Sequence, residues 1–142
     1  MIEKVLLTPL NIIKNSSGDV LHAMKRTDDG FNVFGEAYFS EIEHKAVKAW
    51  KRHREMTLNL IVPTGAIRFV LFDDRENVDG KIWQIVLSRD NYQRLTVPPM
   101  VWVGFQGASS GNSMLLNIAN IVHNPCESDV MDIEAIKFNW EE

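Results

Sequence analysis

Short apolar segments separated by turn-forming residues run along most of this chain, and this pattern restricts its fold more than any other feature. Several segments carry the β-branched and aromatic residues that favour strands, whereas helical periodicity is weak almost everywhere. Glycine, proline, asparagine and aspartate mark the turns between the segments. We therefore expect strands over the following ranges: Phe31–Ser40, Met56–Val62, Ala66–Asp73, Lys81–Leu87, Gln93–Val97, Val101–Gln106 and Ser113–Ile121.

Two pairs of these segments are joined by sequences that are typical of hairpins. Pro63–Gly65 separates Met56–Val62 from Ala66–Asp73, and a proline and glycine turn between two apolar runs predicts that they pair. Arg75–Gly80 separates Ala66–Asp73 from Lys81–Leu87 in a similar way. We expect both pairs to be antiparallel.

The number of expected strands and the length of the chain together predict an all-β fold. The 142 residues suffice for one domain, spanning 1–142, with a single sizeable core. An open sheet of so many strands would leave long unpaired edges, so we expect a small antiparallel sandwich or barrel, as in a double-sheet jelly roll. Short helical turns are expected at Ser88–Tyr92 and Val130–Ile136, and a solvated tail at Phe138–Glu142.

Composition argues against two classes of partner. Fifteen Lys and Arg against nineteen Asp and Glu give a formal net charge of -4, which offers no broad attraction to nucleic acids or anionic membranes. The one cysteine, Cys126, cannot form an internal disulfide, and the start of the chain lacks the apolar run of a signal peptide or membrane span. We therefore expect no nucleic acid, no membrane and a cytoplasmic location.

The basic cluster Lys48–His53 is the strongest candidate for a functional site. On a strand, Lys51 and His53 share one face, while Trp50 and Arg52 lie on the other. An imidazole has the right intrinsic acidity for a general base, and an ammonium beside it could hold an anion, or act as a base if desolvated. The alternative interpretation is a solvated basic edge.

Four segments of the chain, taken in their order, carry a resemblance to a known family: Val47–His53, Gly65–Arg75, Leu87–Asn91 and Leu95–Phe105. They resemble segments of the cupin sugar-nucleotide epimerases and isomerases, the dTDP-4-dehydrorhamnose 3,5-epimerases and the related dTDP-4-keto-6-deoxyhexose 3,4-ketoisomerases. The resemblance covers roughly residues 31–140. Val47–His53 resembles the family's Arg-Gly-X-His segment, and Gly65–Arg75 resembles its Gly-Glu-Val-X-Asp-Val-X-Val-Asp-X-Arg strand. Leu87–Asn91 is similar to the Leu-Ser-X-Glu-Asn turn, and Leu95–Phe105 to the segment that ends in His-Gly-Phe.

The chain departs from this family at three catalytic positions. Lys51 stands where the epimerases have their general-base histidine, and Asn117 stands where they have a tyrosine acid. Val103 replaces the histidine before the Gly-Phe pair. Of the two histidines in the His-X-His segment of the ketoisomerases, this chain keeps the second as His53. The resemblance therefore implies a family pocket with altered chemistry.

Proton transfer next to the carbonyl of a 4-keto-6-deoxy sugar nucleotide, by epimerisation or ketoisomerisation, is the activity that the resemblance implies, in bacterial surface polysaccharide synthesis. The reaction needs a base and a group that holds the enolate oxygen. We expect His53 to move the proton and Lys51 to stabilise the enolate. Lys48, which aligns with the family's arginine, and Arg75 are the candidates to hold phosphate.

Other side chains could contact the sugar or the base of such a ligand. Trp102 could stack on a ring, whereas we expect Phe105 to pack in the core. Three asparagines alternate with apolar residues and either meet sugar hydroxyls or face solvent: Asn59, Asn117 and Asn120.

We expect no metal and no other cofactor, because only His53 and Glu55 fit the ligand pattern of a metal-binding cupin. The resemblance also implies a homodimer, with Val5–Ile13 as a natural edge strand to exchange or cover. Two further functions stay open. One is a cupin that binds a nucleotide sugar, or a partner sugar-biosynthesis enzyme, without turnover, and the other is an unrelated structural β-domain.

Overall fold

Two five-stranded antiparallel sheets form the body of the protein in a computed structural model that describes residues 1–77 and 79–142. The first, called the β4 sheet here, has the strand order β1, β9, β6, β11, β4, and the second, the β5 sheet, has the order β12, β5, β10, β7, β8. The strands of the β4 sheet are β1 (Leu6–Pro9), β9 (Gln93–Val97), β6 (Leu58–Thr64), β11 (Ser113–Ala119) and β4 (Glu36–Ile42). Those of the β5 sheet are β12 (Ser128–Val130), β5 (Val47–His53), β10 (Trp102–Gly107), β7 (Ala66–Asp73) and β8 (Lys81–Ser88).

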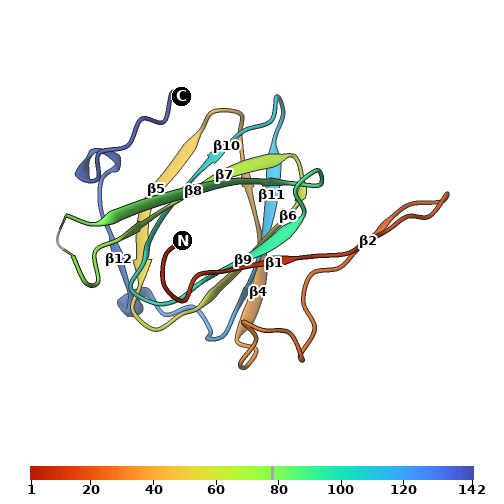
Figure 1. Ribbon diagram of the computed structural model, residues 1–142, viewed down its shortest axis with the longest axis horizontal. Helices are drawn as coiled ribbons and strands as arrows, with labels where there is room; N and C mark the ends of the chain where they lie inside the picture. The colour runs from red at the N-terminus through yellow and green to blue at the C-terminus, as the bar shows by residue number, and fades with distance from the viewer. Residues whose placement is uncertain (78) are drawn as a thin grey trace.

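The two sheets face each other and enclose the main apolar core (Figure 1). Leu60 and Leu95 of the β4 sheet belong to the same buried cluster as Phe69 and Leu71 of the β5 sheet. Removing these apolar side chains from water is the main favourable contribution to folding. The arrangement is a cupin-type jelly roll, and the all-β prediction is confirmed.

Alternation along β11 shows how the sequence decides what enters the space between the sheets. Ser113, Leu115, Asn117 and Ala119 are buried, and the residues between them are only partly buried. Successive strand residues point to opposite faces, so all four point inward. A polar amide, Asn117, therefore occupies a position that would otherwise belong to the apolar core.

The hairpin predicted between Met56–Val62 and Ala66–Asp73 is wrong. β6 pairs with β9 and β11 in one sheet, and β7 pairs with β10 and β8 in the other. The chain crosses between the sheets at Gly65, which has a φ of 78° and lies against Ser113 so closely that a Cβ would clash. The turn residues therefore mark a change of sheet, because glycine tolerates this backbone conformation. The second predicted hairpin, between β7 and β8, is confirmed.

The N-terminal edge differs from the single strand expected over Val5–Ile13. β1 pairs with β9 at the edge of the β4 sheet, and β2 (Ile12–Ile13) pairs with β3 (Val20–Leu21) in a separate hairpin. This hairpin projects from the body of the protein (Figure 1).

The predicted helical turns are replaced by other structure. No helix forms at Ser88–Tyr92, where β8 continues to Ser88 and a turn follows. Within Val130–Ile136 only Ile133–Ala135 forms a 3-10 helix, η2, and a second one, η1, covers Pro125–Glu127.

The C-terminal tail is packed, contrary to the solvated end that we expected. Trp140 lies in a second apolar cluster with Trp50 and Trp102 on the outer side of the β5 sheet. The carbonyl oxygen of Trp140 accepts hydrogen bonds from Arg68 and Gln106, each at 3.0 Å. The tail is ordered because it covers apolar side chains on the outward face of a sheet.

Candidate active site

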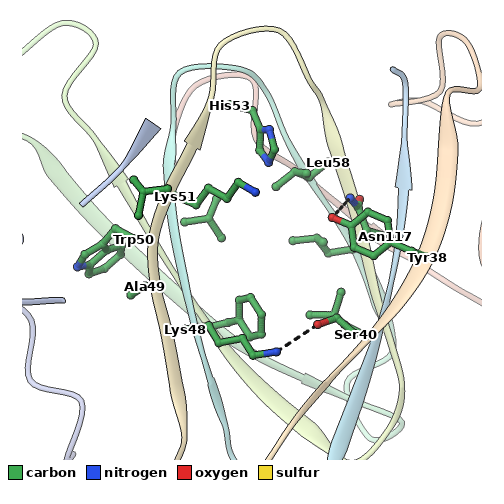
Figure 2. A pocket seen from close by; sticks show the side chains of 14 residues that line it. Tyr38, Ser40, Lys48, Ala49, Trp50, Lys51, His53, Leu58 and Asn117 are labelled. Atoms are coloured by element: carbon green, nitrogen blue, oxygen red, sulfur yellow. Dashed lines mark hydrogen bonds between the residues drawn. The ribbon is translucent and has the colours of Figure 1, made fainter. Parts of the chain in front are cut away.

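A cavity of about 430 Å³ lies between the two sheets (Figure 2). The β5 sheet contributes three basic side chains to one wall, and the β4 sheet contributes hydroxyl and amide groups to the other. The rest of the lining is mostly apolar, whereas Lys48, Lys51 and Tyr38 are exposed to solvent at its mouth. The lining residues are Tyr38, Ser40, Lys48, Ala49, Trp50, Lys51, His53, Leu58, Leu60, Val103, Phe105, Leu115, Asn117 and Val130.

A bulge in β5 brings Lys48 to the same wall as Lys51 and His53. In the pairing with β10, Lys51 lies opposite Val103 and Lys48 lies opposite Phe105, so three steps along β5 match two along β10. One extra residue in a strand reverses which face the following side chains occupy. Strict alternation would place Lys48 on the outer face, and the bulge places its side chain in the cavity.

The ammonium of Lys48 reaches across to the opposite sheet. Its Nζ donates a hydrogen bond of 2.7 Å to the carbonyl oxygen of Glu41 and lies 3.4 Å from Ser40 Oγ. It also lies 5.8 Å from the centre of the Phe105 ring. An ammonium has three donors, so one N–H remains for a ligand.

His53 is held by a buried carboxylate, that of Glu127. The His53 side chain is 8% exposed and its ring points into the cavity (Figure 2), while Nδ1 contacts Glu127 Oε1. The other carboxylate oxygen, Oε2, accepts hydrogen bonds from the backbone N–H groups of Glu55 at 3.1 Å and Met56 at 3.2 Å. The imidazole is therefore fixed in position and orientation.

The state of Glu127 defines the tautomer of His53. Burial acts to raise the pKa of Glu127, but the hydrogen bonds from His53 and from two backbone amides outweigh it, and the pKa lies below its ordinary value. An ionised carboxylate can only accept, so Nδ1 carries the hydrogen. In the neutral ring, Nε2 is then unprotonated and free to take a proton.

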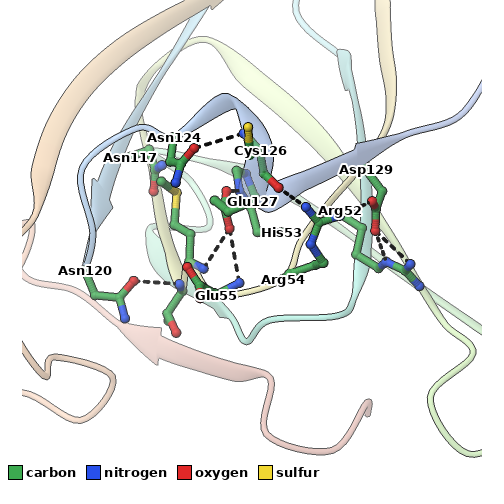
Figure 3. Close-up of polar contacts among 12 residues, drawn as sticks. Arg52, His53, Arg54, Glu55, Asn117, Asn120, Asn124, Cys126, Glu127 and Asp129 are labelled. Atoms are coloured by element: carbon green, nitrogen blue, oxygen red, sulfur yellow. Dashed lines mark hydrogen bonds and ion pairs between the residues drawn. The ribbon is translucent and has the colours of Figure 1, made fainter.

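Ion pairs fasten the strand that follows Glu127 to β5 (Figure 3). The guanidinium of Arg52 donates to Asp129 Oδ2 at 2.8 Å, and Arg54 donates to Asp129 Oδ1 at 2.5 Å. Arg54 also donates to the carbonyl oxygen of Cys126. The hydrogen bond from Arg52 and the charge of Arg54 hold the pKa of Asp129 below its ordinary value. These contacts keep β12 against β5 and hence Glu127 beside His53.

The wall opposite His53 carries a tyrosine hydroxyl that the sequence analysis did not anticipate. Tyr38 of β4 lies directly across from Asn117 of β11. Asn117 Nδ2 donates to Tyr38 Oη at 3.1 Å, and Asn117 Oδ1 accepts from the backbone N–H of Asn59 at 3.1 Å. An imidazole and a hydroxyl thus face a common space from opposing sheets, an arrangement that can support proton transfer to and from a bound molecule.

Comparison with solved structures identifies the family. A dTDP sugar isomerase from Desulfovibrio desulfuricans is 39% identical and superposes with a TM-score of 0.94, over 99% of this chain and 92% of the other. The chain belongs to the dTDP sugar isomerase family. No family model matches the chain.

Two other proteins resemble this chain at lower sequence identity. QdtA, a sugar 3,4-ketoisomerase from Thermoanaerobacterium thermosaccharolyticum, is 18% identical with a TM-score of 0.76 over 91% of this chain and 89% of the other, and it shares the fold. The Bacillus subtilis spore coat polysaccharide biosynthesis protein SpsL is 25% identical over 146 residues, which cover 99% of this chain and 97% of the relative.

Four of the predicted site residues lie in the cavity: His53, Lys51, Lys48 and Asn117. Arg75 does not line it. The guanidinium of Arg75 is bound to Asp73 at 2.8 Å and to the carbonyl oxygen of Glu3 at 2.7 Å, and the first contact raises its pKa.

Trp102 and two of the asparagines also lie outside the cavity. Trp102 points to the outer side of the β5 sheet, where the guanidinium of Arg52 lies 4.6 Å from its ring centre. Asn59 points away because its neighbours Leu58 and Leu60 point inward, and its side chain binds Gly30 and Thr96. Asn120 Oδ1 caps the backbone N–H of Thr57 at 2.8 Å.

Glu127, Tyr38 and Ser40 are the site residues that sequence reasoning missed. Glu127 is 74 positions from its partner His53, and no spacing rule connects them. Tyr38 and Ser40 alternate in one strand, which is a usable signal for a shared face, but only the pairing of β4 with β11 puts that face on the cavity.

Within the described ranges 1–77 and 79–142, no group of three or more His, Cys, Asp and Glu side chains is placed to hold a metal ion. In the same ranges, no helix is long and apolar enough to cross a membrane.

Proposed function

We propose that this protein transfers a proton next to the carbonyl group of a 4-keto-6-deoxy sugar linked to dTDP. One observation carries the proposal: a buried histidine–carboxylate pair, His53 and Glu127, opens onto a cavity whose far wall presents the hydroxyl of Tyr38. The family relationship supports the ligand class, because the relative that is 39% identical is a dTDP sugar isomerase.

In the proposed reaction His53 is the base. Nε2 removes the hydrogen from the carbon beside the carbonyl as a proton, and the electron pair of the C–H bond moves to give an enolate. Lys51 lies two residues away on the same wall, and its ammonium stabilises the negative charge on the enolate oxygen. Tyr38, on the opposite wall, returns a proton to the carbon from its other side.

Opposed walls favour epimerisation over ketoisomerisation. Inversion of a carbon needs proton removal on one face of the sugar ring and proton delivery on the other, and His53 and Tyr38 belong to facing sheets. Ketoisomerisation can proceed with one group that carries the proton between neighbouring atoms on one face. A pocket that only binds a nucleotide sugar has no need of a histidine oriented by a buried carboxylate.

Lys48 is our candidate for the diphosphate of the ligand. Its remaining N–H can make a charge-assisted hydrogen bond to a phosphate oxygen, which is about twice as strong as a neutral one. The apolar side chains of Leu58, Leu60 and Leu115 then contact the sugar. Arg75 is left out of the proposal because Asp73 and Glu3 occupy its guanidinium.

We also propose a cytoplasmic location and a role in surface polysaccharide synthesis. The second is supported by the Bacillus subtilis relative, a spore coat polysaccharide biosynthesis protein.

We propose that the protein is a homodimer. Phe39 is 63% exposed and points away from the cavity, because it alternates with Tyr38 and Ser40. Val33 and Phe34, which precede β4 in the chain, are also exposed. An apolar patch at the edge of a sheet favours association, and we assign it to a second copy of this chain.

The proposed reaction is tested with dTDP-4-keto-6-deoxyglucose in deuterated water. Nuclear magnetic resonance follows loss of the protons on the carbons beside the carbonyl and the appearance of a new sugar. Exchange supports proton transfer, and the configuration of the product separates epimerisation from ketoisomerisation. Binding without exchange would support the non-catalytic alternative instead.

A further inference from the structure

The side-chain amide of Asn117 has little capacity left for a ligand. Asn117 is 1% exposed, its oxygen accepts from the backbone N–H of Asn59, and its nitrogen donates to Tyr38 Oη. Asparagine has one carbonyl oxygen and one NH₂ group to satisfy when it is buried. The oxygen and one N–H are engaged by the protein, and burial leaves the second N–H little access to a sugar hydroxyl, one of the two roles considered for Asn117 above.

The orientation of this amide is unambiguous. A backbone N–H can only donate, so the side-chain atom of Asn117 that faces Asn59 must be the oxygen. The NH₂ group then necessarily faces Tyr38, as Figure 2 shows. Asn59 lies in β6, between Leu58 and Leu60. Its backbone N–H donates to the side chain of Asn117, whereas in a regular sheet it would donate to a backbone carbonyl of the neighbouring strand.

This orientation fixes the role of the Tyr38 hydroxyl. Because Asn117 Nδ2 donates to Tyr38 Oη, the phenol oxygen is an acceptor toward Asn117, and its own hydrogen has to point elsewhere. Tyr38 lines the cavity, and no other hydrogen-bond partner of Oη is found within residues 1–77 and 79–142. The O–H is thus free to be donated to a bound molecule.

We propose that Asn117 is a positioning residue that aims the hydroxyl proton of Tyr38 at the substrate. The inference rests on the proposed function and adds to it the side-chain amide of Asn117, which makes the Tyr38 hydroxyl a hydrogen-bond donor toward the substrate. Asn117 and the backbone N–H of Asn59 act through Tyr38 and do not touch the reacting carbon. The site thus has a tyrosine donor, Tyr38 of β4, whose hydroxyl is oriented by Asn117 of β11.

The test uses Asn117→Asp, which keeps the shape and the acceptor for Asn59 but has no N–H to donate. Its carboxylate accepts the hydroxyl proton of Tyr38 and turns it away from the substrate. Two rates are measured on dTDP-4-keto-6-deoxyglucose: deuterium exchange, which reports proton removal by His53, and product formation, which reports proton delivery. The matched control is Asn120→Asp, an asparagine whose oxygen also caps a backbone N–H but lies outside the cavity.

We expect Asn117→Asp to lower product formation about 100-fold, the size of a general-acid contribution, with a much smaller loss of exchange. Tyr38→Phe should do the same, and the double variant should be no slower than the slower single variant. Losses that multiply in the double variant, or exchange and product formation that fall together, overturn the inference. A wild-type chain that exchanges no deuterium contradicts the proposed function itself and removes the catalytic role of Asn117 with it.

A second measurement needs no substrate. The chain has two tyrosines, so Tyr92→Phe leaves Tyr38 as the only one, and a ¹³C label on the ring carbon that bears the hydroxyl gives one resonance. We expect this resonance to move when Asn117→Asp is added to the Tyr92→Phe chain, because the hydroxyl changes from acceptor to donor. A resonance that does not move overturns the inference whatever the activity.

Discussion

His53 Nδ1 donates a hydrogen bond to the carboxylate of Glu127, and both side chains are buried beside the cavity. The contact orients the ring and, in its neutral form, leaves Nε2 without a hydrogen. Replacing Glu127 by Gln presents an amide that can donate to Nδ1 and so favours the wrong tautomer.

We expect Glu127→Gln to lower the rate of deuterium exchange by about 100-fold or more, since general-base catalysis contributes about that much. Asp129→Asn measures the part of the loss that comes from a displaced β12, because Asp129 binds Arg52 and Arg54 and not His53, and we expect a much smaller loss from it. Equal losses for the two variants would mean that the effect comes from β12 as a whole.

Glu127 also makes the stability of the protein depend on pH. Its folded-state pKa lies below the ordinary value of 4.5, so the ionised carboxylate stabilises the fold above that pH. This contribution is lost as the pH falls through the lower, folded-state pKa. In urea unfolding, the advantage of the wild type over Glu127→Gln should be largest near neutral pH and shrink below about pH 4.5. An advantage that stays constant into acid would contradict this assignment.

The two lysines of the cavity should affect different steps. Lys51→Met removes the cation proposed for the enolate, and the loss of one such group costs about 100- to 1,000-fold in kcat. Lys48→Met removes the proposed phosphate contact and should weaken dTDP binding by about tenfold or more, as for a hydrogen bond to a charged group. Calorimetry and initial rates separate the two effects. Lys81→Met, whose ammonium binds the carbonyl oxygen of Met1, should change neither.

Sequence patterns identified most strands but could not assign them to sheets. Ala66–Asp73 and Gln93–Val97 have the bounds predicted for them, because apolar and β-branched residues end there at turn residues. The same Pro63–Gly65 signal, however, fits a hairpin and a crossing between sheets equally well. The pairing of β6 with β9 and β11, and of β7 with β10 and β8, distinguishes them, and these pairings are not local in sequence.

The candidate site was predictable where one strand carries it. Alternation along a strand is enough to predict that Lys51 and His53 share one face. Lys48 lies in the cavity because β5 has a bulge where it pairs with β10, and alternation does not predict that bulge. Glu127 and Tyr38 come from other strands, and their positions depend on pairings between distant parts of the chain.

The C-terminal tail should contribute measurably to stability. Trp140 packs against Trp50 with ring centres 5.4 Å apart and against Phe138 at 4.7 Å. Trp140→Ala should lower the free energy of unfolding by about 3 kcal/mol or more, as for other large buried aromatic residues. Glu142→Ala, in the exposed end of the same tail, should have no effect in the same urea titration. Equal stability of both variants would contradict the packed tail.

The proposed dimer makes a prediction about the outer face of the β4 sheet. Phe39→Glu places a charge in the exposed apolar patch and should lower the mass measured by light scattering from that of two chains to that of one. Ile82→Glu, at an exposed position on β8 of the other sheet, should leave the mass unchanged. A wild-type protein that is monomeric at high concentration would contradict the proposal.

Deuterium exchange with His53→Asn is the most direct measurement of the proposed proton transfer. The wild-type chain and the variant are incubated with dTDP-4-keto-6-deoxyglucose in deuterated water, and binding of dTDP is measured in parallel to show that the cavity is intact. We expect the wild type to exchange a proton beside the carbonyl and His53→Asn to bind dTDP without exchange. Exchange at the same rate in both proteins would contradict the assignment of His53 as the base.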